Sequence, residues 1–112
     1  VSATCVRVPV VRAHSEAVNI EFDREVSPEE VRGWLAGAPG VRVVDDPARL
    51  AFPTPLDAQD GDDGLVGRIR RGPGNPRAVA LWLTGDQLRQ GAALNAVPIA
   101  ESGLGIEVLR PA

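Results

Sequence analysis

The sequence predicts an α+β domain built on a single mixed β-sheet, with helices on one face of the sheet. Three observations lead to this fold class: short strand-like segments dominate the chain, two of them flank a turn rich in glycine and proline, and only two segments carry helical signals. With 112 residues, 44% of them hydrophobic, the chain is expected to form one domain over residues 1–112. Because two helices are too few to cover both faces, we expect a second subunit or a missing domain to cover the other face.

The first two strands are expected near the N-terminus. Val6–Val11 is rich in β-branched residues, although Pro9 cannot donate a hydrogen bond to a neighbouring strand and suggests an edge or a bulge. Ala17–Asp23 alternates between apolar and polar residues, which is typical of a half-buried strand. The turn between the two strands, at residues 12–16, would carry His14. The apolar face of the second strand would hold Val18, Ile20 and Phe22.

A strong helix start follows at Ser27. Ser27 can cap the helix, Pro28 suits its first position, and Glu30 completes a capping box. The helix is expected to run to about Ala38, because a Pro-Gly pair follows and ends it. Its buried side chains would be Val31, Trp34 and Leu35.

Three more strands are predicted in the middle of the chain. Val41–Val44 reads as a short strand, whereas Asp45–Gly64 is rich in Pro, Asp and Gly and predicts a long loop of the kind that is functional or packs against a partner. Leu65–Arg71 and Ala78–Thr84 flank the turn sequence GPGNP and therefore predict a hairpin. Since the second of these strands is nearly all apolar, we expect it to be central and covered on both faces.

The last predicted element is a helix that begins at Asp86, has the sequence DQLRQGAALNAV, and is interrupted or ended by Pro98. Gly91 in its interior costs about 1 kcal/mol relative to alanine. A close approach of another group to the backbone at Gly91 would account for a glycine at this position.

The composition argues against several classes of function. The net charge is −3 and the basic residues are scattered, so neither nucleic acid nor an anionic membrane surface is expected as a partner. Lysine is absent, which rules out a lysine Schiff base and a phosphate-loop lysine. One cysteine and one histidine cannot form an internal disulfide or a zinc cluster, and we expect no metal site.

Nothing in the sequence predicts membrane insertion or export. No apolar run approaches the ~20 residues of a membrane-spanning helix. Val1–Thr4 leads directly into strand-like residues without a signal-peptide pattern, so we expect a cytoplasmic protein. Because methionine is absent, either an initiator methionine was removed ahead of Val1 or the sequence is a piece of a longer chain.

The pair of side chains that best suggests a functional site lies near the N-terminus. Arg7 could bind a carboxylate through two parallel hydrogen bonds, and His14, the only histidine, could exchange a proton near neutral pH. A site that holds a carboxylate substrate and moves a proton would use both. They could equally be surface residues, because a separation of seven places them on opposite faces of an unbroken strand. They converge only if the chain bends at Pro9 or at Arg12–Ala13.

Other candidate residues have plain structural interpretations. Cys5 shares a strand face with Arg7 and could be an activated nucleophile, but a small buried side chain is the commoner role for such a cysteine. The acidic run Asp57–Gly64 lacks the register and the final glutamate of a calcium loop, so we interpret it as a solvated turn. The glycine pairs at 72–74 and 103–105 lack the context of a dinucleotide-binding fingerprint.

Taken together, four stretches resemble one known family. They are VSATCVRVPVVRAHSE, SPEEVRGWLAGAPGV, PTPLDAQDGDDGLVGRIRR and GDQLRQGAALNAVPIAE, and they follow one another in this order from Val1 to about Glu101. In this order they resemble the C-terminal part of bacterial aspartate-β-semialdehyde dehydrogenase, a substrate-binding and dimerisation domain. The combination of CVRVPV with a following HS pair, VGRIR and the DQLRQGAALN run carries the resemblance.

The resemblance implies a function and a set of roles. Enzymes of this family reductively dephosphorylate aspartyl phosphate with NADPH in amino-acid biosynthesis. The family's substrate-binding arginine corresponds to Arg7, and its acid/base histidine corresponds to His14. Gln87 and the backbone at Gly91 correspond to positions near the NADP cofactor. The resemblance also implies a homodimer and a small carboxylate substrate.

The chain lacks two parts that the family's reaction needs. The cysteine nucleophile and the nucleotide-binding domain belong to the family's N-terminal portion, and Cys5 does not match that nucleophile. We therefore expect half of an oxidoreductase active site, inactive alone and able to use NADP only together with the missing nucleotide-binding half. The alternative is a repurposed stand-alone domain that acts as a dimerisation or binding module, or as a small acid/base catalyst, without dehydrogenase activity.

Overall fold

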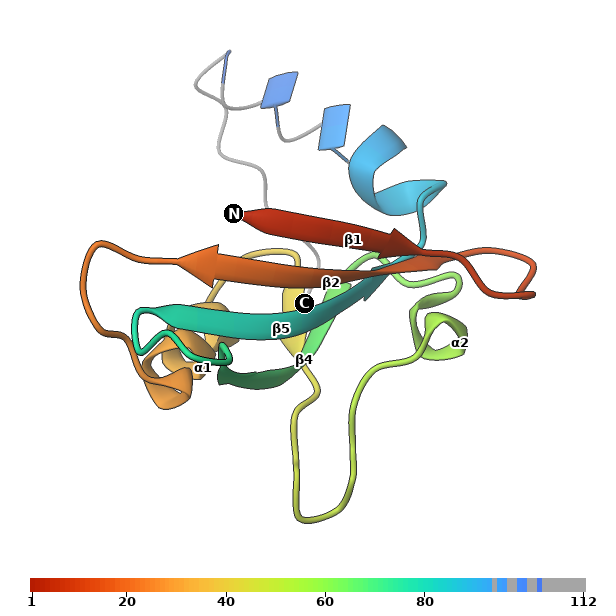
Figure 1. The fold of residues 1–112 in the computed structure, drawn as a ribbon. Helices are drawn as coiled ribbons and strands as arrows, with labels where there is room; N and C mark the ends of the chain where they lie inside the picture. Colours follow the sequence, from red (N-terminus) through yellow and green to blue (C-terminus); the bar gives the residue numbers. More distant parts are fainter. Residues whose placement is uncertain (94, 97–98, 101–102, 104–112) are drawn as a thin grey trace.

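The computed structural model describes residues 1–93, 95–96, 99–100 and 103, and its centre is one five-stranded sheet (Figure 1). The strands lie in the order β1-β2-β5-β4-β3. Neighbouring strands are antiparallel except β3 and β4, which are parallel, so the sheet is mixed and the α+β prediction is confirmed. The strands are β1 (Ser2–Val6), β2 (His14–Glu21), β3 (Val41–Val43), β4 (Gly64–Arg71) and β5 (Ala78–Gly85).

The first strand lies earlier in the chain than predicted. β1 ends at Val6, so the prediction of a strand over Val6–Val11 is wrong, and Pro9 lies in the connection that reverses the chain toward β2. This connection ends at Ala13, whose positive φ of 75° turns the backbone into the next strand. His14 is the first residue of β2 rather than part of a turn. The local β-branched composition was overridden because a proline cannot supply a ladder hydrogen bond.

The hydrophobic core lies on one face of the sheet, beneath α1 (Pro28–Ala36). The predicted alternation in β2 is confirmed, because Val18 is buried in this core and Ile20 and Phe22 pack against it. β5 is central, as predicted, and its Val79, Ala80 and Leu81 are buried on both faces. The buried residues of the core are Val18, Val26, Val31, Val66, Ile69, Val79 and Leu81.

The helix α1 begins with the predicted capping box. The Ser27 hydroxyl accepts a hydrogen bond from the Glu30 N–H at 3.1 Å, and the Glu30 carboxylate accepts one from the Ser27 N–H at 2.9 Å. Val31 is buried as expected, but the prediction that Trp34 is buried is wrong, because it is 50% exposed. Trp34 instead packs edge-to-face against the Phe22 ring, with centroids 5.9 Å apart.

The capping box predicts a dependence of stability on pH. The Ser27 N–H, and then Arg24, lower the pKa of Glu30 from its ordinary value of 4.5. A lowered pKa in the folded state means that the stabilisation is present above pH ~4.5 and is lost as pH falls through the folded pKa. We expect the free energy of unfolding in urea to fall less between pH 6 and pH 3 in the Glu30→Gln variant than in the unchanged chain. An equal slope in both proteins would contradict this role, and Glu29→Gln is the matched control within the same helical turn.

Part of the other sheet face is covered by the segment that was predicted to be a long loop. This segment contains a short helix, α2 (Pro55–Ala58), which contacts β5. Ala58 is fully buried in a small cluster with Ala13 and Leu65, and the indole N–H of Trp82 donates to the Pro53 carbonyl at 3.1 Å. The loop therefore packs back onto the sheet through apolar contacts and one backbone-directed hydrogen bond.

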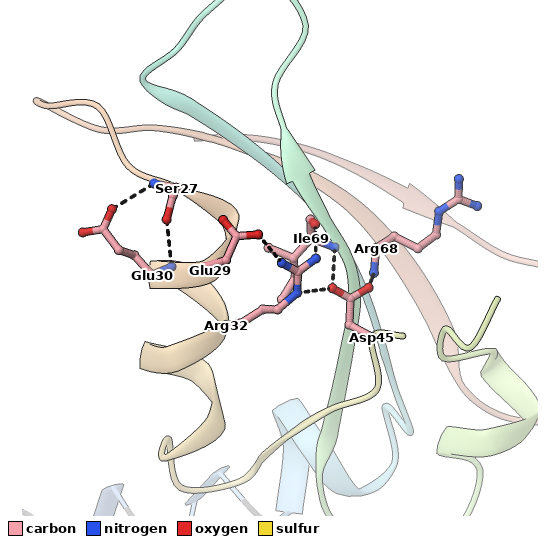
Figure 2. Close-up of polar contacts among 7 residues, drawn as sticks. All are labelled: Ser27, Glu29, Glu30, Arg32, Asp45, Arg68 and Ile69. Atoms are coloured by element: carbon pink, nitrogen blue, oxygen red, sulfur yellow. Dashed lines mark hydrogen bonds and ion pairs between the residues drawn. The ribbon is translucent and has the colours of Figure 1, made fainter. Parts of the chain in front are cut away.

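A β-bulge interrupts β4 next to the core. Gly67 pairs with Trp82 and Arg70 pairs with Ala80, so β4 carries one more residue than β5 in this stretch, and Arg68 has a positive φ of 52°. The freed backbone groups are satisfied by an ion pair from outside the strand, which Figure 2 shows. This arrangement keeps Ile69 in the core.

The ion pair at the bulge consists of Asp45 and Arg32. The Asp45 carboxylate accepts hydrogen bonds from the N–H groups of Arg68 at 2.7 Å and Ile69 at 3.3 Å, and from Arg32 Nε at 2.7 Å. Arg32 Nη2 donates to the Ile69 carbonyl at 2.7 Å. The Asp45 side chain is only 3% exposed, so a buried carboxylate with three donors joins the segment that follows β3 to helix α1 and to β4 (Figure 2).

The predicted C-terminal helix is broken. Asp86–Gln90 forms a turn, and the segment η1 (Arg89–Ala93) contains non-helical dihedral angles at Gln90, Gly91 and Ala92. The glycine is explained by its positive φ of 86°, because within the described residues, its two chain neighbours aside, no heavy atom lies within 4 Å of the position where a Gly91 Cβ would be. The predicted end of this helix at Pro98 lies outside the described residues. Among the described residues, no helix is long and apolar enough to cross a membrane.

Candidate functional site

The candidate site lies at the corner of the sheet where β1 ends, β2 begins and β5 ends (Figure 1). The last pair between β1 and β2 is Val6 with Ser15, so Arg7 and His14 are the next residues along the two antiparallel strands. Residues that are seven apart in sequence are thereby brought to one corner by a chain reversal, not by a single strand. His14 also pairs with Gly85, which places the segment beginning at Asp86 beside it.

His14 lies at the start of β2 with its side chain partly exposed. Its Nε2 lies 3.3 Å from Oε1 of Glu16, two residues along the same strand and therefore on the same face. Its carbonyl accepts a hydrogen bond from the Thr84 hydroxyl at 2.9 Å, which ties the start of β2 to β5. His14 Nδ1 is buried without a hydrogen-bond partner in the described part of the chain, and the side chain is 28% exposed.

Arg7 directly follows the end of β1 at this corner. The residue is exposed, and no ion pair joins it to another residue within the described ranges. An exposed guanidinium can bind a carboxylate through two parallel hydrogen bonds. The structure therefore brings Arg7 and His14 to the same corner.

Gln87 and Gly91 follow directly from the end of β5. Gln87 is half-buried, and its side-chain Oε1 is buried without a hydrogen-bond partner among the described residues. An unpaired buried acceptor is unfavourable in an isolated domain and is suited to a donor from outside it. Gly91 is exposed and its backbone is open to approach. These two positions continue the site beyond Gly85.

Two acidic residues of this corner were missed by the reasoning from sequence. Glu16 could have been found, because residues two apart on a strand share a face, so a His-x-Glu pattern places the carboxylate beside the imidazole. Asp86 was predicted only to start a helix, yet its side chain is fully buried and contacts both Arg12 and Asp60. No local sequence signal indicates contacts between segments this far apart in the chain.

The other sequence candidates take structural roles. Cys5 is exposed and pairs with Glu16 across β1 and β2, so its interpretation as a buried side chain is wrong. The acidic run is bound to arginines, with Asp60 contacting Arg12 and Asp62 contacting Arg89. Within the described ranges, no group of three His, Cys, Asp or Glu residues is placed to hold a metal ion.

Comparison with known proteins decides the family. Residues 1–90 match the family described as "Semialdehyde dehydrogenase, dimerisation domain". The chain belongs to this family. The resemblance seen in the sequence is therefore confirmed, and the matched range includes Arg7, His14 and Gln87.

Two relatives of this semialdehyde dehydrogenase dimerisation domain are named aspartate-semialdehyde dehydrogenase. The chain is 56% identical over 101 residues to the aspartate-semialdehyde dehydrogenase of Synechocystis sp., covering 90% of this chain and 30% of that protein. It is 48% identical over 101 residues to the enzyme of Aquifex aeolicus, again covering 90% and 30%. The chain thus spans less than a third of the length of these relatives.

A solved structure shares the fold of the domain. Aspartate semialdehyde dehydrogenase II of Vibrio cholerae, in a structure titled as complexed with ASA, superposes with a TM-score of 0.76 at 38% identity. The match covers 85% of this chain and 28% of that chain. The sheet and helix arrangement of the semialdehyde dehydrogenase dimerisation domain is therefore that of the corresponding part of a longer protein.

Proposed function

We propose that this chain is the C-terminal, substrate-binding and dimerisation part of an NADP-dependent aspartate-semialdehyde dehydrogenase. The observation that supports the proposal is that Arg7 directly follows β1 and His14 begins β2 at one corner of the sheet, in a chain that belongs to the semialdehyde dehydrogenase dimerisation family. The nucleotide-binding domain and the cysteine nucleophile would come from a part of the enzyme outside these 112 residues. The domain alone would then hold half of the active site.

Arg7 and His14 would have different roles in the proposed reaction. Arg7 would bind the substrate carboxylate through its guanidinium and so fix the orientation of the substrate. His14 would hold or release the proton that the reacting oxygen gains or loses, because an imidazole exchanges protons near neutral pH. Glu16, at 3.3 Å from His14 Nε2, would orient the imidazole ring. The thiolate that attacks the acyl group would be supplied from outside this chain.

Gln87 and Gly91 fit a nicotinamide cofactor at one edge of the proposed site. The Oε1 of Gln87 is buried and has no hydrogen-bond partner within the described residues, so it is suited to accept a hydrogen bond from an amide group, and the residue Gly91 is exposed. When bound, NADP would supply the hydride chemistry. The chain's own residues would hold one side of the cofactor, and the nucleotide-binding domain would hold the rest.

The partner proposed for the sheet is a second copy of the same chain. The matching family is described as a dimerisation domain. The sheet face opposite α1 is only partly covered, and it carries a groove of about 360 Å³ whose lining includes Trp82, Phe52, Arg68 and Arg70. An incompletely covered face of this kind is suited to a subunit contact, which we expect to bury aromatic and arginine side chains.

A hybrid enzyme tests the proposed function. In this hybrid, the chain replaces the matching 101-residue segment of the Synechocystis aspartate-semialdehyde dehydrogenase, to which it is 56% identical. We expect a folded dimer that oxidises the semialdehyde with NADP and phosphate. A folded hybrid that lacks activity would contradict the proposal and would favour the alternative of a repurposed binding or dimerisation module. The unmodified Synechocystis enzyme is the control.

A further inference from the structure

The Asp86 carboxylate joins three segments of the chain behind the proposed site. Its Oδ2 accepts a hydrogen bond from the Asp60 N–H at 2.9 Å and lies 3.4 Å from Arg12 Nε. Its Oδ1 accepts one from the Leu88 N–H at 3.0 Å. The side chain is 0% exposed, and each of its two oxygens contacts at least one of these protein groups.

Two of these segments carry residues of the proposed site. Arg12 belongs to the connection at residues 7–13, which starts at Arg7 and ends directly before His14. Leu88 belongs to the turn at residues 86–90, which contains Gln87 and leads to Gly91. We name these the substrate-side connection and the cofactor-side turn. The third segment, at Asp60, belongs to the acidic loop between α2 and β4.

The contacts of Asp86 exceed what the local turn requires. A turn of this kind is closed by one carboxylate oxygen bonding the N–H two residues ahead, which Oδ1 does for Leu88. The Asp86 carbonyl also accepts from the N–H groups of Arg89 at 3.0 Å and Gln90 at 2.8 Å. Oδ2 is therefore free for contacts outside the turn, and both of its contacts are to remote segments.

The burial of Asp86 makes these contacts mutually dependent. A buried carboxylate is tolerated only when its charge and its lone pairs are matched by donors. If either the substrate-side connection or the cofactor-side turn moved away, the buried carboxylate would lose the contact with Arg12 or with the Leu88 N–H. Because this loss costs free energy, Asp86 opposes movement of either segment relative to the other.

We infer that Asp86 is a positioning residue that holds the substrate-side connection and the cofactor-side turn in one fixed arrangement. It touches neither substrate nor cofactor and acts through Arg12 and the Leu88 N–H. The inference rests on the proposed function for its enzymatic meaning, because that function assigns Arg7, His14 and Gln87 to one site. Its structural content, a link between the two segments, is testable on the chain by itself.

Hydrogen exchange of the 112-residue chain tests the link. We expect Asp86→Asn to speed amide exchange at least about tenfold in both the substrate-side connection and the cofactor-side turn. Arg12→Gln leaves the turn's own hydrogen bonds intact, and it should raise exchange in the turn as well as in its own segment. Glu21→Gln is the matched control, since it breaks the exposed pair with Arg77 at the opposite end of the same strands. Exchange that rises only in the mutated segment would overturn the inference.

The hybrid enzyme gives the second measurement. We expect Asp86→Asn to lower kcat and to raise KM for both NADP and the semialdehyde, with a combined loss in kcat/KM on the order of 100-fold. The double variant with Arg12→Gln should lose clearly less than the sum of the two single losses, because both changes break the contact between Arg12 and Asp86. Additive losses would overturn the inference. An inactive parent hybrid would instead count against the proposed function, while the exchange result would still decide the link.

Discussion

Replacing His14 with glutamine in the hybrid enzyme is expected to reduce kcat by about 10²- to 10⁴-fold. Glutamine can still hydrogen-bond but cannot exchange a proton near neutral pH, so the change removes the proposed proton transfer and little else. KM for the semialdehyde should change far less, because Arg7 is proposed to bind the substrate carboxylate. Steady-state kinetics at pH 7, with both substrates varied, measures the two effects separately.

The His14 prediction has a matched control and a clear contrary result. Arg77→Gln removes an exposed ion pair near the opposite end of β2 and should leave both kinetic constants close to those of the parent hybrid. A His14→Gln variant with unchanged kcat would show that another group transfers the proton. In contrast, Arg7→Gln should act mainly by raising KM for the semialdehyde, which separates binding from proton transfer.

Replacing Asp45 with alanine is expected to lower the free energy of unfolding of the 112-residue chain by about 3 kcal/mol. The change leaves the N–H groups of Arg68 and Ile69 without their acceptor and deprives Arg32 of a buried partner. Since domains of this size are stable by roughly 5–15 kcal/mol, the loss is a large fraction of the total. Urea unfolding followed by tryptophan fluorescence measures it.

Asp23 provides the control for the Asp45 prediction. It is an exposed aspartate outside the helices and strands, and Asp23→Ala should change the unfolding free energy by no more than about 0.5 kcal/mol. Asp45→Asn should fall between the two, because the amide oxygen can still accept while the charge opposite Arg32 is lost. If Asp45→Ala were as mild as Asp23→Ala, water would be replacing the carboxylate at the bulge.

The parts of the fold that sequence predicts well are those set by local chemistry. The α1 start follows from Ser27, Pro28 and Glu30, whose side chains bond backbone groups within one turn. The hairpin between β4 and β5 follows from the GPGNP turn between two apolar segments, and the central position of β5 follows from its two buried faces. Each of these features depends on residues close together in the chain.

The parts that sequence predicts poorly depend on distant contacts. The first strand ends at Val6, and although Pro9 signals an interruption, it does not show that the strand lies before it and pairs with β2. The bulge at Arg68 is stable only because Asp45, far from it in sequence, accepts its freed N–H groups. Trp34 is an apolar residue of the kind expected in a core, but in α1 it is half-exposed and packs edge-to-face against Phe22.

The candidate site shows the same division. Reasoning from the residues alone left Arg7 and His14 on opposite faces of a strand, and the resemblance to a family supplied their roles. In the structure the chain reverses between them, so Arg7 follows the end of β1 and His14 begins β2 at the same corner of the sheet. The position of Glu16 beside His14 could be predicted, because residues two apart on a strand share a face. The contacts of Asp86 could not be predicted, because two of its partners lie in two separate loops.

The strand order has a consequence for how the chain folds. β4 and β5 are joined by a short turn and can pair early, but β2 must wait for β5, because Val18 pairs with Leu81 near the other end of the described chain. Closing so long a loop is entropically costly and slows folding. We expect φ-values near zero for β1 and β2 and higher values for the β4–β5 hairpin. Within these 112 residues, the segment from Arg7 to His14 is therefore made before its partner strand β5 and reaches its final place late in folding.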